Sequence, residues 1–513
     1  MPNILLHTAT AAALAALTAL TASPVAAQAA ALRLEPCRLQ GVENGALCGR
    51  LMRPLDPAQP QGTQIELHLA VLPAVARNKK PDPVFFFAGG PGQSAIALAG
   101  PISQQLRRTL NRRDVVLIDQ RGTGLSAPLQ CPEPSPLMPL AEATDPAQQA
   151  QVLKDCAQAL KKLPYGDLRL FTTVLASQDA EAVRLALGAA QVNLVGGSYG
   201  TRAALDYLRQ FPQAVRRVVL DGVAPPDMVL PASFSPDSQA ALDQMLADCE
   251  AEAACRTRFP TLRADWAALL ASLPREVTVK HPVTAQPERF VLQRDMALSL
   301  VRTPLYSPAL ASALPLVISE AAGGRFDAML GLGLAMSSRR SLQLAVGMHF
   351  SVVCAEDVPR LGNSAETAGA DFGDQFASLY RSVCADWPRA QVPADFYTLP
   401  PTRAPTLVLS GGLDPATPPR HGARVAQALG PLARHVVVPH AGHGVMGLRC
   451  MRDVLHRFID APTDAAAQQV DADCAQTMPR PGAFMLPAAG SVPNTLPNTT
   501  TTPGSRLTTE RRP

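Results

Sequence analysis

The chain has 513 residues, which is longer than a single hydrophobic core usually grows, so we expect a large domain with an insertion or two packed domains. Apolar residues make up 47% and charged residues 17% of the chain, and this composition excludes a protein that is disordered throughout. The formal net charge is only +4 and the two signs are interspersed, so the sequence indicates no nucleic-acid partner.

The first thirty residues are rich in Ala and Leu and predict a signal peptide over residues 1–30. Pro24 interrupts the apolar run, and the small residues from Ala27 to Ala30 fit a cleavage site. No Lys or Arg precedes the apolar run, which departs from the usual pattern, so a buried or anchoring helix is the alternative. No later stretch is apolar over about 18 residues, so we expect no membrane attachment after cleavage and a secreted or periplasmic protein.

All ten cysteines follow this segment, and none belongs to a C-x-x-C pair. An even number of cysteines in an exported chain predicts disulfides, whereas the alternative is a cytosolic enzyme with free, buried thiols. Pairing sequence neighbours gives five bridges: Cys37–Cys48, Cys131–Cys156, Cys249–Cys255, Cys354–Cys384 and Cys450–Cys474.

Short runs of β-branched and aromatic residues predict the strands of the core. Several of these runs are continuously apolar, which is typical of parallel strands covered on both faces. Helical patterns alternate with them, as at 201–211 and at 177–190, where Ser177 is the expected N-cap. We therefore expect an α/β fold with a mostly parallel, doubly wound sheet. The predicted strands are 65–74, 83–90, 114–122, 191–200, 215–223, 405–412 and 434–442.

The alternation stops between the fifth and the sixth of these strands, where the pattern is mostly helical. We expect residues 225–400 to form a helical cap over the carboxyl end of the sheet, where open α/β sheets place their sites. The core then comprises residues 31–224 and 401–486. The tail, residues 487–513, is rich in Pro, Thr and Asn, and we expect it to be disordered.

The segment G-G-S-Y-G at 196–200 matches the pattern G-x-S-x-G and lies between a predicted strand and a predicted helix. A tight turn in this context strains the backbone of the serine and projects its hydroxyl at a helix N-terminus. An ordinary glycine turn is the alternative for so common a pattern. The strand-turn-helix context favours Ser198 as a nucleophile.

A nucleophilic serine needs a histidine that takes its proton and a carboxylate that orients the histidine. In this kind of sheet the acid and then the histidine follow the later strands. Asp414 and His443 are predicted as the acid and the base, because each follows the end of a late strand. The competing candidates, which are less well placed relative to the strand ends, are His435, His440, Asp206 and Asp357.

Acyl transfer also needs N–H donors for the developing oxyanion. We expect one from the backbone of Tyr199, directly after the nucleophile, and the second from Gly90 in the loop G-G-P-G at 89–92, for which a simple turn is the alternative. The sequence contains no H-E-x-x-H or comparable ligand cluster, so we expect neither a metal nor an organic cofactor.

Together the motifs resemble the α/β-hydrolase serine peptidases of the prolyl aminopeptidase and secreted tripeptidyl aminopeptidase family. The resemblance spans roughly residues 60–475 and implies an α/β-hydrolase fold with Ser198, Asp414 and His443 as the triad. The motifs that carry it are A-G-G-P-G (88–92), D-Q-R-G-T-G-L-S (119–126), G-G-S-Y-G-T (196–201), V-L-D-G-V-A-P-P (219–226), G-G-L-D-P-A-T-P (411–418) and A-G-H-G (441–444).

Two details of the resemblance bear on the site. Members of the family commonly have His before G-G-P-G, where this chain has Ala88, so the choice between prolyl and tripeptidyl specificity stays open. We treat residues 119–126 as structural support around the site, with a strand-end turn as the alternative.

An aminopeptidase must bind the ammonium group of its substrate, and a carboxylate in the cap is a simple solution. Glu356 and Asp357 follow Cys354 in a segment that resembles a cap motif of this family, and they are predicted to bind that group. A surface acidic pair held by a disulfide is the alternative.

The sequence thus predicts a secreted, monomeric serine exopeptidase that acts on peptides with a free N-terminus through an acyl-enzyme. A carboxylesterase or lipase with the same triad is the alternative within enzymes, because the fold does not fix the substrate. A noncatalytic binding protein on the same scaffold is expected to have lost a triad residue, and none is missing.

Overall fold

The structure is a computed structural model that describes residues 32–334, 344–363 and 366–486. The predicted signal peptide (1–30) and the predicted disordered tail (487–513) lie outside the described residues. In the described part of the chain, every helix is too short or too polar to cross a membrane.

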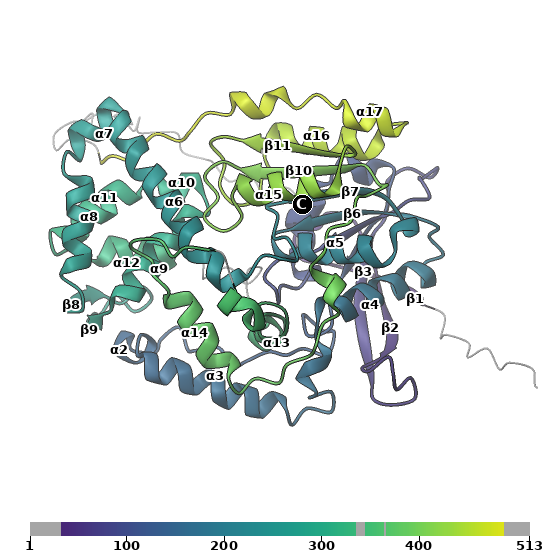
Figure 1. Cartoon of the computed structure of the whole chain (residues 1–513), viewed down its shortest axis with the longest axis horizontal. Coiled ribbons are helices and arrows are strands. Elements are labelled where there is room, and N and C mark those ends of the chain that lie inside the picture. Colours follow the sequence, from purple (N-terminus) through teal and green to yellow (C-terminus); the bar gives the residue numbers. More distant parts are fainter. Residues whose placement is uncertain (1–31, 335–343, 364–365, 487–513) are drawn as a thin grey trace, which may run out of the picture. The chain divides into compact units, whose positions relative to one another are not determined.

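A nine-stranded sheet forms the centre of the core (Figure 1), in the order β1-β2-β3-β5-β4-β6-β7-β10-β11. Neighbouring strands from β5 to β11 are parallel, whereas the pairs β1-β2, β2-β3 and β3-β5 are antiparallel. The mostly parallel sheet is therefore confirmed. The strands are β1 Arg33–Cys37, β2 Ala46–Pro54, β3 Gln64–Leu72, β4 Val84–Phe87, β5 Val115–Ile118, β6 Val192–Gly197, β7 Val215–Asp221, β10 Thr406–Gly411 and β11 Ala433–Val438.

The two faces of the sheet pack against different helices. On β4, the side chains of Phe85 and Phe87 belong to one hydrophobic cluster, while those of Val84 and Phe86 belong to another, as the twofold period of a strand requires. The first cluster includes helices α4 (Thr173–Ala186), α5 (Tyr199–Gln210) and α15 (Pro419–Leu429). The second includes α1 (Ala99–Gln105), α16 (Arg449–Asp460) and α17 (Asp464–Gln468).

Helix α4 begins earlier than predicted. Thr172 is its N-cap and accepts a hydrogen bond from the Leu175 N–H, at 3.4 Å. Ser177, the predicted N-cap, is buried inside the helix. The prediction was wrong because Thr and Ser are both good N-caps, and the burial of Thr173 and Ala176 in the first turn was not visible in the sequence.

The chain between β7 and β10 is mostly helical and has a hydrophobic cluster of its own, which includes Trp266 and Leu298. One two-stranded hairpin, β8 (Arg275–Lys280) with β9 (Pro287–Leu292), is added to the helices. We call this region the cap. Its helices are α6 Leu230–Ala251, α7 Ala253–Arg258, α8 Leu262–Ala271, α9 Arg294–Leu305, α10 Pro308–Ala311, α11 Leu314–Ala322, α12 Asp327–Leu334, α13 Val346–Glu356 and α14 Gln375–Cys384.

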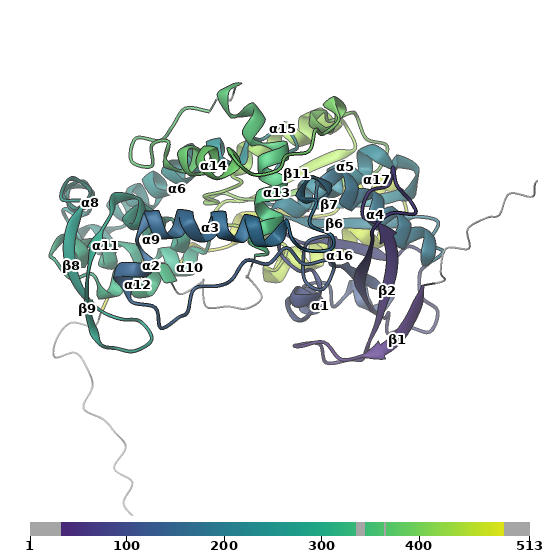
Figure 2. The same cartoon turned by 90° about the horizontal axis from the view of Figure 1, so that it is seen from below.

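Two further segments join the cap, which the sequence analysis did not predict, and Figure 2 shows the first of them in blue beside the cap helices. Helices α2 (Leu140–Ala143) and α3 (Pro146–Leu160) precede the nucleophile in the chain, yet α3 contacts α13 and α14, and the Leu140 N–H donates to Glu288 at 2.8 Å. Residues 478–486, which we call the return segment, also reach the cap: Arg480 binds Glu252 at 2.9 Å.

The ten cysteines form the five bridges predicted from the sequence. Cys354–Cys384 joins α13 to α14, and Cys249–Cys255 joins α6 to α7. The bridges therefore constrain the cap as well as the core.

Candidate active site

Ser198 lies at the turn between β6 and α5, with φ of +56° and ψ of −127°. Its N–H donates to the Asp221 carbonyl at 2.9 Å. The turn is tight because α5 approaches β4 closely: a Cβ on Gly200 would lie 2.0 Å from the Phe87 carbonyl oxygen, which excludes any other residue there. A strained serine on such a turn is typical of a nucleophile elbow.

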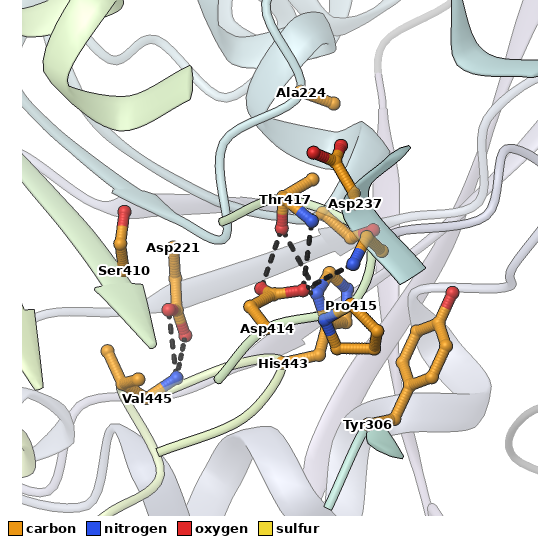
Figure 3. Close-up of polar contacts among 12 residues, drawn as sticks. Asp221, Ala224, Asp237, Tyr306, Ser410, Asp414, Pro415, Thr417, His443 and Val445 are labelled. Carbon is orange, nitrogen blue, oxygen red and sulfur yellow. Dashed lines mark hydrogen bonds and ion pairs between the residues drawn. The ribbon is translucent and has the colours of Figure 1, made fainter. Parts of the chain in front are cut away.

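Asp414 follows β10 and His443 follows β11, and the two side chains meet (Figure 3). His443 Nδ1 lies 2.8 Å from Asp414 Oδ2. The other carboxylate oxygen accepts the N–H groups of Ala416 and Thr417, at 2.8 and 2.9 Å. The Thr417 hydroxyl donates to Oδ2, at 2.8 Å. These bonds orient the carboxylate and hold the imidazole with Nδ1 protonated and Nε2 free to accept a proton.

Asp414 and His443 shift each other's pKa values in opposite directions. Burial alone would raise the pKa of Asp414, but the positive charge of His443 and the hydrogen bonds outweigh burial and hold that pKa below its usual range. Burial opposes a charged His443, but Asp414 outweighs it and raises the pKa of His443. The pair therefore favours an imidazolium with a carboxylate beside it, which is what a general base needs after it takes a proton.

Ser198 and His443 both lie next to the backbone of Asp221 and Gly222, but their side chains are not hydrogen-bonded to each other. The Asp221 carbonyl binds the Ser198 N–H, and a Cβ on the next residue, Gly222, would lie 3.3 Å from His443 Cε1. In substrate-free enzymes catalytic hydrogen bonds are often long and tighten when substrate binds. All three predicted triad residues thus follow the carboxyl ends of parallel strands of the sheet, β6, β10 and β11.

Asp221 has a role at this edge that the sequence analysis missed. Its carboxylate accepts the N–H group of Val445, at 2.9 Å from each oxygen (Figure 3), and that of Met446, at 2.9 Å. These bonds fix the loop that carries His443. Burial raises the pKa of Asp221 to about 6. The motif V-L-D-G was visible in the sequence, but Asp221 contacts Val445, which lies 224 residues further along the chain.

The G-G-P-G loop lies beside the nucleophile, as predicted. A Cβ on Gly89 would lie 3.2 Å from Ser198 Cβ, and Gly90 follows with φ of +110°. Asp119 fixes the chain directly after this loop, because its Oδ1 accepts hydrogen bonds from the Ser94 hydroxyl at 2.6 Å and from the Ile96 N–H at 3.0 Å. The structural role expected for 119–126 agrees with these contacts.

The cap also contacts this loop. His349 on α13 lies 3.2 Å from the Pro91 carbonyl through Nδ1, and its Nε2 lies 2.6 Å from the Tyr380 hydroxyl. Burial lowers the pKa of His349, so the neutral ring donates to Pro91 and accepts from Tyr380. Ala88, where family members commonly have His, is buried and apolar. A histidine of the cap thus touches the loop, and no motif in the sequence pointed to it.

Glu356 and Asp357 do not lie where a substrate ammonium could reach them, and the prediction for them needs correction. Both residues are completely buried. Asp357 binds the Arg202 guanidinium through two hydrogen bonds, at 3.0 and 3.1 Å. Glu356 accepts the N–H of Thr173 at 2.7 Å. The charge of Asp357 is therefore already paired with Arg202, and the carboxyl oxygens of Glu356 are already bound by Thr173.

Arg202 is the residue that sequence reasoning overlooked here. It lies on α5, one turn after the nucleophile, so the ion pair joins α5 to the end of α13. Burial raises the pKa of Glu356 to about 8, although the nearby Arg202 charge opposes this shift. Glu356 contacts Thr173, whose hydroxyl lies 2.7 Å from the hydroxyl of Tyr199. Glu356 is thus linked through Thr173 to Tyr199, the residue after Ser198.

The competing candidates lie away from this arrangement. His435 binds the Ser410 hydroxyl at 2.9 Å, and His440 is exposed. Asp206 binds Arg209 within α5, at 2.8 Å. In the described parts of the chain, no group of three or more side chains is arranged to hold a metal ion.

Comparison with known protein families gives two matches. The family described as "alpha/beta hydrolase fold" matches residues 82–280, and the family described as "TAP-like protein" matches residues 368–474. The first includes Ser198, and the second includes Asp414 and His443.

Among characterised proteins, the chain is similar to "Serine protease Hip1" of Mycobacterium tuberculosis, with 26% identity over 77% of this chain and 82% of the relative. It is also similar to "Tripeptidyl aminopeptidase" of Streptomyces lividans, with 30% identity over 35% of each chain. "Carboxylesterase B" of Mycobacterium tuberculosis is 28% identical over 81% of this chain and 84% of the relative. These relatives include both peptidases and an esterase.

Proposed function

Because this chain belongs to the α/β-hydrolase serine peptidase family, we propose that it is a serine exopeptidase that releases N-terminal residues or short peptides from its substrates. The observation that carries the proposal is the Asp414–His443 pair, which lies at the edge of the sheet beside the strained Ser198. The similarity to a tripeptidyl aminopeptidase supports the exopeptidase class.

In the proposed reaction the Ser198 hydroxyl attacks the scissile carbonyl while His443 Nε2 takes the hydroxyl proton. Asp414 stabilises the imidazolium through Nδ1. The backbone N–H groups of Tyr199 and Gly90 donate to the oxyanion. His443 then gives its proton to the leaving amine, and a water molecule, activated in the same way, hydrolyses the acyl-enzyme.

The test is the loss of function on removal of the nucleophile. Ser198→Ala should fold normally and lose on the order of 10⁴-fold or more in kcat, since the triad acts as a unit. A fluorophosphonate probe should label the wild-type protein at Ser198 and leave the variant unlabelled. Ser410→Ala, which removes a hydroxyl that contacts His435 rather than the triad, is the matched control. Near-normal hydrolysis by Ser198→Ala would exclude the mechanism.

An esterase is the second candidate, and two observations favour it. Carboxylesterase B is similar over most of its length, and the acidic pair predicted to bind an ammonium group is buried. Peptides with a free or an acetylated N-terminus, compared with a neutral p-nitrophenyl ester, separate the two functions. Equal cleavage of free and acetylated peptides, with much faster ester hydrolysis, would favour the esterase.

We further propose that the protein acts outside the cytoplasm as a monomer. The five disulfides support this location, because such bonds persist in oxidising compartments. Fractionation of the native host cells, followed by activity measurement and size-exclusion chromatography, tests both points.

A further inference from the structure

The end of α9 in the cap lies directly against His443. The Tyr306 carbonyl accepts the backbone N–H of His443 at 2.9 Å. The Tyr306 ring meets the imidazole edge to face, with 5.1 Å between ring centres, and Figure 3 shows the two side chains next to each other. Residues on this part of α9 are therefore neighbours of the general base.

Arg302 lies one turn earlier on α9 and is held in place by two hydroxyl groups. Its Nη2 donates to the Tyr306 hydroxyl and its Nε donates to Ser238, each at 2.8 Å. The Ser238 hydroxyl in turn lies 3.3 Å from the carbonyl of Pro415, the residue after Asp414. Arg302 is thus linked to both the base and the acid of the triad.

Aromatic rings surround the guanidinium group. Its central carbon lies 4.9 Å from the ring centre of Phe234, 5.1 Å from that of Tyr306 and 5.3 Å from that of Phe376. Rings at these distances attract a cation and remove part of its water. A partly desolvated guanidinium binds an anion more strongly than one in open solvent does.

The same group of cap side chains extends to the oxyanion side of the site. The Phe234 ring centre lies 6.5 Å from that of Tyr380, and Tyr380 binds His349, which contacts the Pro91 carbonyl. Arg302 therefore belongs to a continuous set of cap residues that runs from His443 to the loop of Gly90.

The positive charge of Arg302 has no carboxylate partner among the described residues. Two of its five N–H groups are used by Tyr306 and Ser238, and the described residues leave the Nη1 donors unbound. The neighbouring acid, Asp237, is already bound to Arg420 at 2.8 Å and to His421 at 2.9 Å. An arginine kept without a counter-ion, but with free donors, is suited to bind a carboxylate of a ligand.

We propose that Arg302 binds a carboxylate of the substrate close to the scissile bond, and that the enzyme therefore prefers acidic substrates. This inference rests on the proposed function, because it assigns a substrate class to the same site. The carboxylate can come from an acidic side chain before the scissile bond or from the free C-terminus of the leaving group. Both offer two oxygens to the planar guanidinium fork.

Matched pairs of substrates distinguish the two sources. In the first pair, Ala-Ala-Glu-p-nitroanilide is compared with Ala-Ala-Gln-p-nitroanilide. In the second, Ala-Ala-Ala-Ala with a free C-terminus is compared with its C-terminal amide, with products measured by mass spectrometry. If no peptide is cleaved, the hydrolysis of p-nitrophenyl hydrogen succinate is compared with that of p-nitrophenyl butyrate, which makes the same test with an ester. Each pair differs by one charge and little in size.

In at least one pair, the wild-type enzyme should show a kcat/KM that is about 10- to 100-fold higher for the anionic member, which is the usual range for a hydrogen bond to a charged group. Arg302→Gln should reduce that ratio to about one, and Arg302→Lys should give an intermediate ratio. The ratio compares two substrates of the same variant, so a change that affects both substrates equally does not alter it. Arg289→Gln, an exposed cap arginine on β9, should leave the ratio unchanged.

A wild-type enzyme without a preference in any pair would overturn the inference, whether or not the variants fold. So would an Arg302→Gln variant that keeps the wild-type ratio. Failure of the proposed function is a separate outcome: hydrolysis of all the substrates would then be absent or would persist in Ser198→Ala.

Discussion

The carboxyl edge of the sheet and the cap hold their polar groups in different ways. At the sheet edge, Asp221 and Asp414 are each fixed by two backbone N–H groups. In the cap, Arg302 is bound by two side-chain hydroxyls, and His349 is bound by the Tyr380 hydroxyl as well as by the Pro91 carbonyl. Backbone donors persist when side chains change, whereas hydroxyl partners disappear with a single substitution. The fold itself therefore fixes the proposed catalytic groups, whereas the proposed recognition residues of the cap can change one side chain at a time.

The largest effect should come from the sheet edge. Asp414→Asn should lower kcat/KM by about 10⁴-fold, since an amide no longer holds His443 in the tautomer that can accept a proton. The variant should remain folded, because the amide oxygen can still accept the backbone N–H groups of Ala416 and Thr417. Steady-state kinetics with circular dichroism check both points. A loss below tenfold would show that another residue orients the histidine.

The second effect concerns the ion pair between Arg202 on α5 and Asp357 at the end of α13. Asp357→Asn should reduce the free energy of unfolding by about 3–5 kcal/mol, since it leaves the Arg202 charge buried without its partner. Urea unfolding measures this loss. Activity per folded molecule should change equally for peptides and for esters. A selective loss of activity toward peptides with a free N-terminus would restore Asp357 as the ammonium site.

Glu356→Gln is the matched control for this variant and should cost far less. Burial raises the pKa of Glu356 from its ordinary 4.5 to about 8, so the residue is protonated in the folded state at neutral pH. The folded state then binds a proton that the unfolded state lacks between these values. Glu356 therefore makes the wild-type protein lose stability as the pH rises through this window, and the variant should show a flatter pH dependence. Unfolding in urea at pH 5, 7 and 9 tests the sign.

A smaller effect should follow removal of one hydroxyl at the sheet edge. Thr417→Val removes one of four hydrogen bonds to Asp414 and leaves the backbone N–H groups in place. We expect kcat/KM to fall by about 3- to 10-fold, in keeping with a single buried hydrogen bond. A loss as large as that of Asp414→Asn would mean that the backbone bonds do not suffice to orient the carboxylate.

The smallest effect links the cap to the base. His443 must be neutral to accept a proton, so activity should fall as the pH drops through its raised pKa. The charge of Arg302 opposes protonation of His443. Arg302→Gln should therefore move the acidic limb of the kcat/KM profile to higher pH, and the shift should be small because other charges and solvent screen this contact. A neutral substrate should be used so that binding of the substrate charge does not interfere.

The sequence could predict those features that depend on neighbouring residues. The continuously apolar strands, the serine turn and all five disulfides belong to this group, because each leaves a local pattern. Strands β1 and β2 were missed since they are half exposed and lack such a run. Asp414 and His443 were predicted as acid and base from their places after strand ends, and the structure brings their side chains into contact.

The features that were missed depend on contacts between distant parts of the chain. Arg202 and Asp357 are separated by 155 residues. The sequence around Asp357 therefore gave no sign that Arg202 neutralises the charge of Asp357. Arg302 lies in a segment whose pattern indicated only a helix of the cap. Its aromatic neighbours Phe234 and Phe376 come from two other helices, and only the packing of the three helices brings them around the guanidinium group.

The return segment has a consequence for any attempt to treat the cap as a module. The Phe484 N–H donates to the Ser312 carbonyl at 2.8 Å, and Ala483 packs against the cap cluster. The cap is therefore assembled from three stretches of chain, one before the nucleophile, one between β7 and β10, and one at the end of the core. Exchanging caps between related enzymes requires that all three be transferred together. If only the insertion between β7 and β10 were replaced, Leu140 and the return segment would lose the cap surfaces against which they pack.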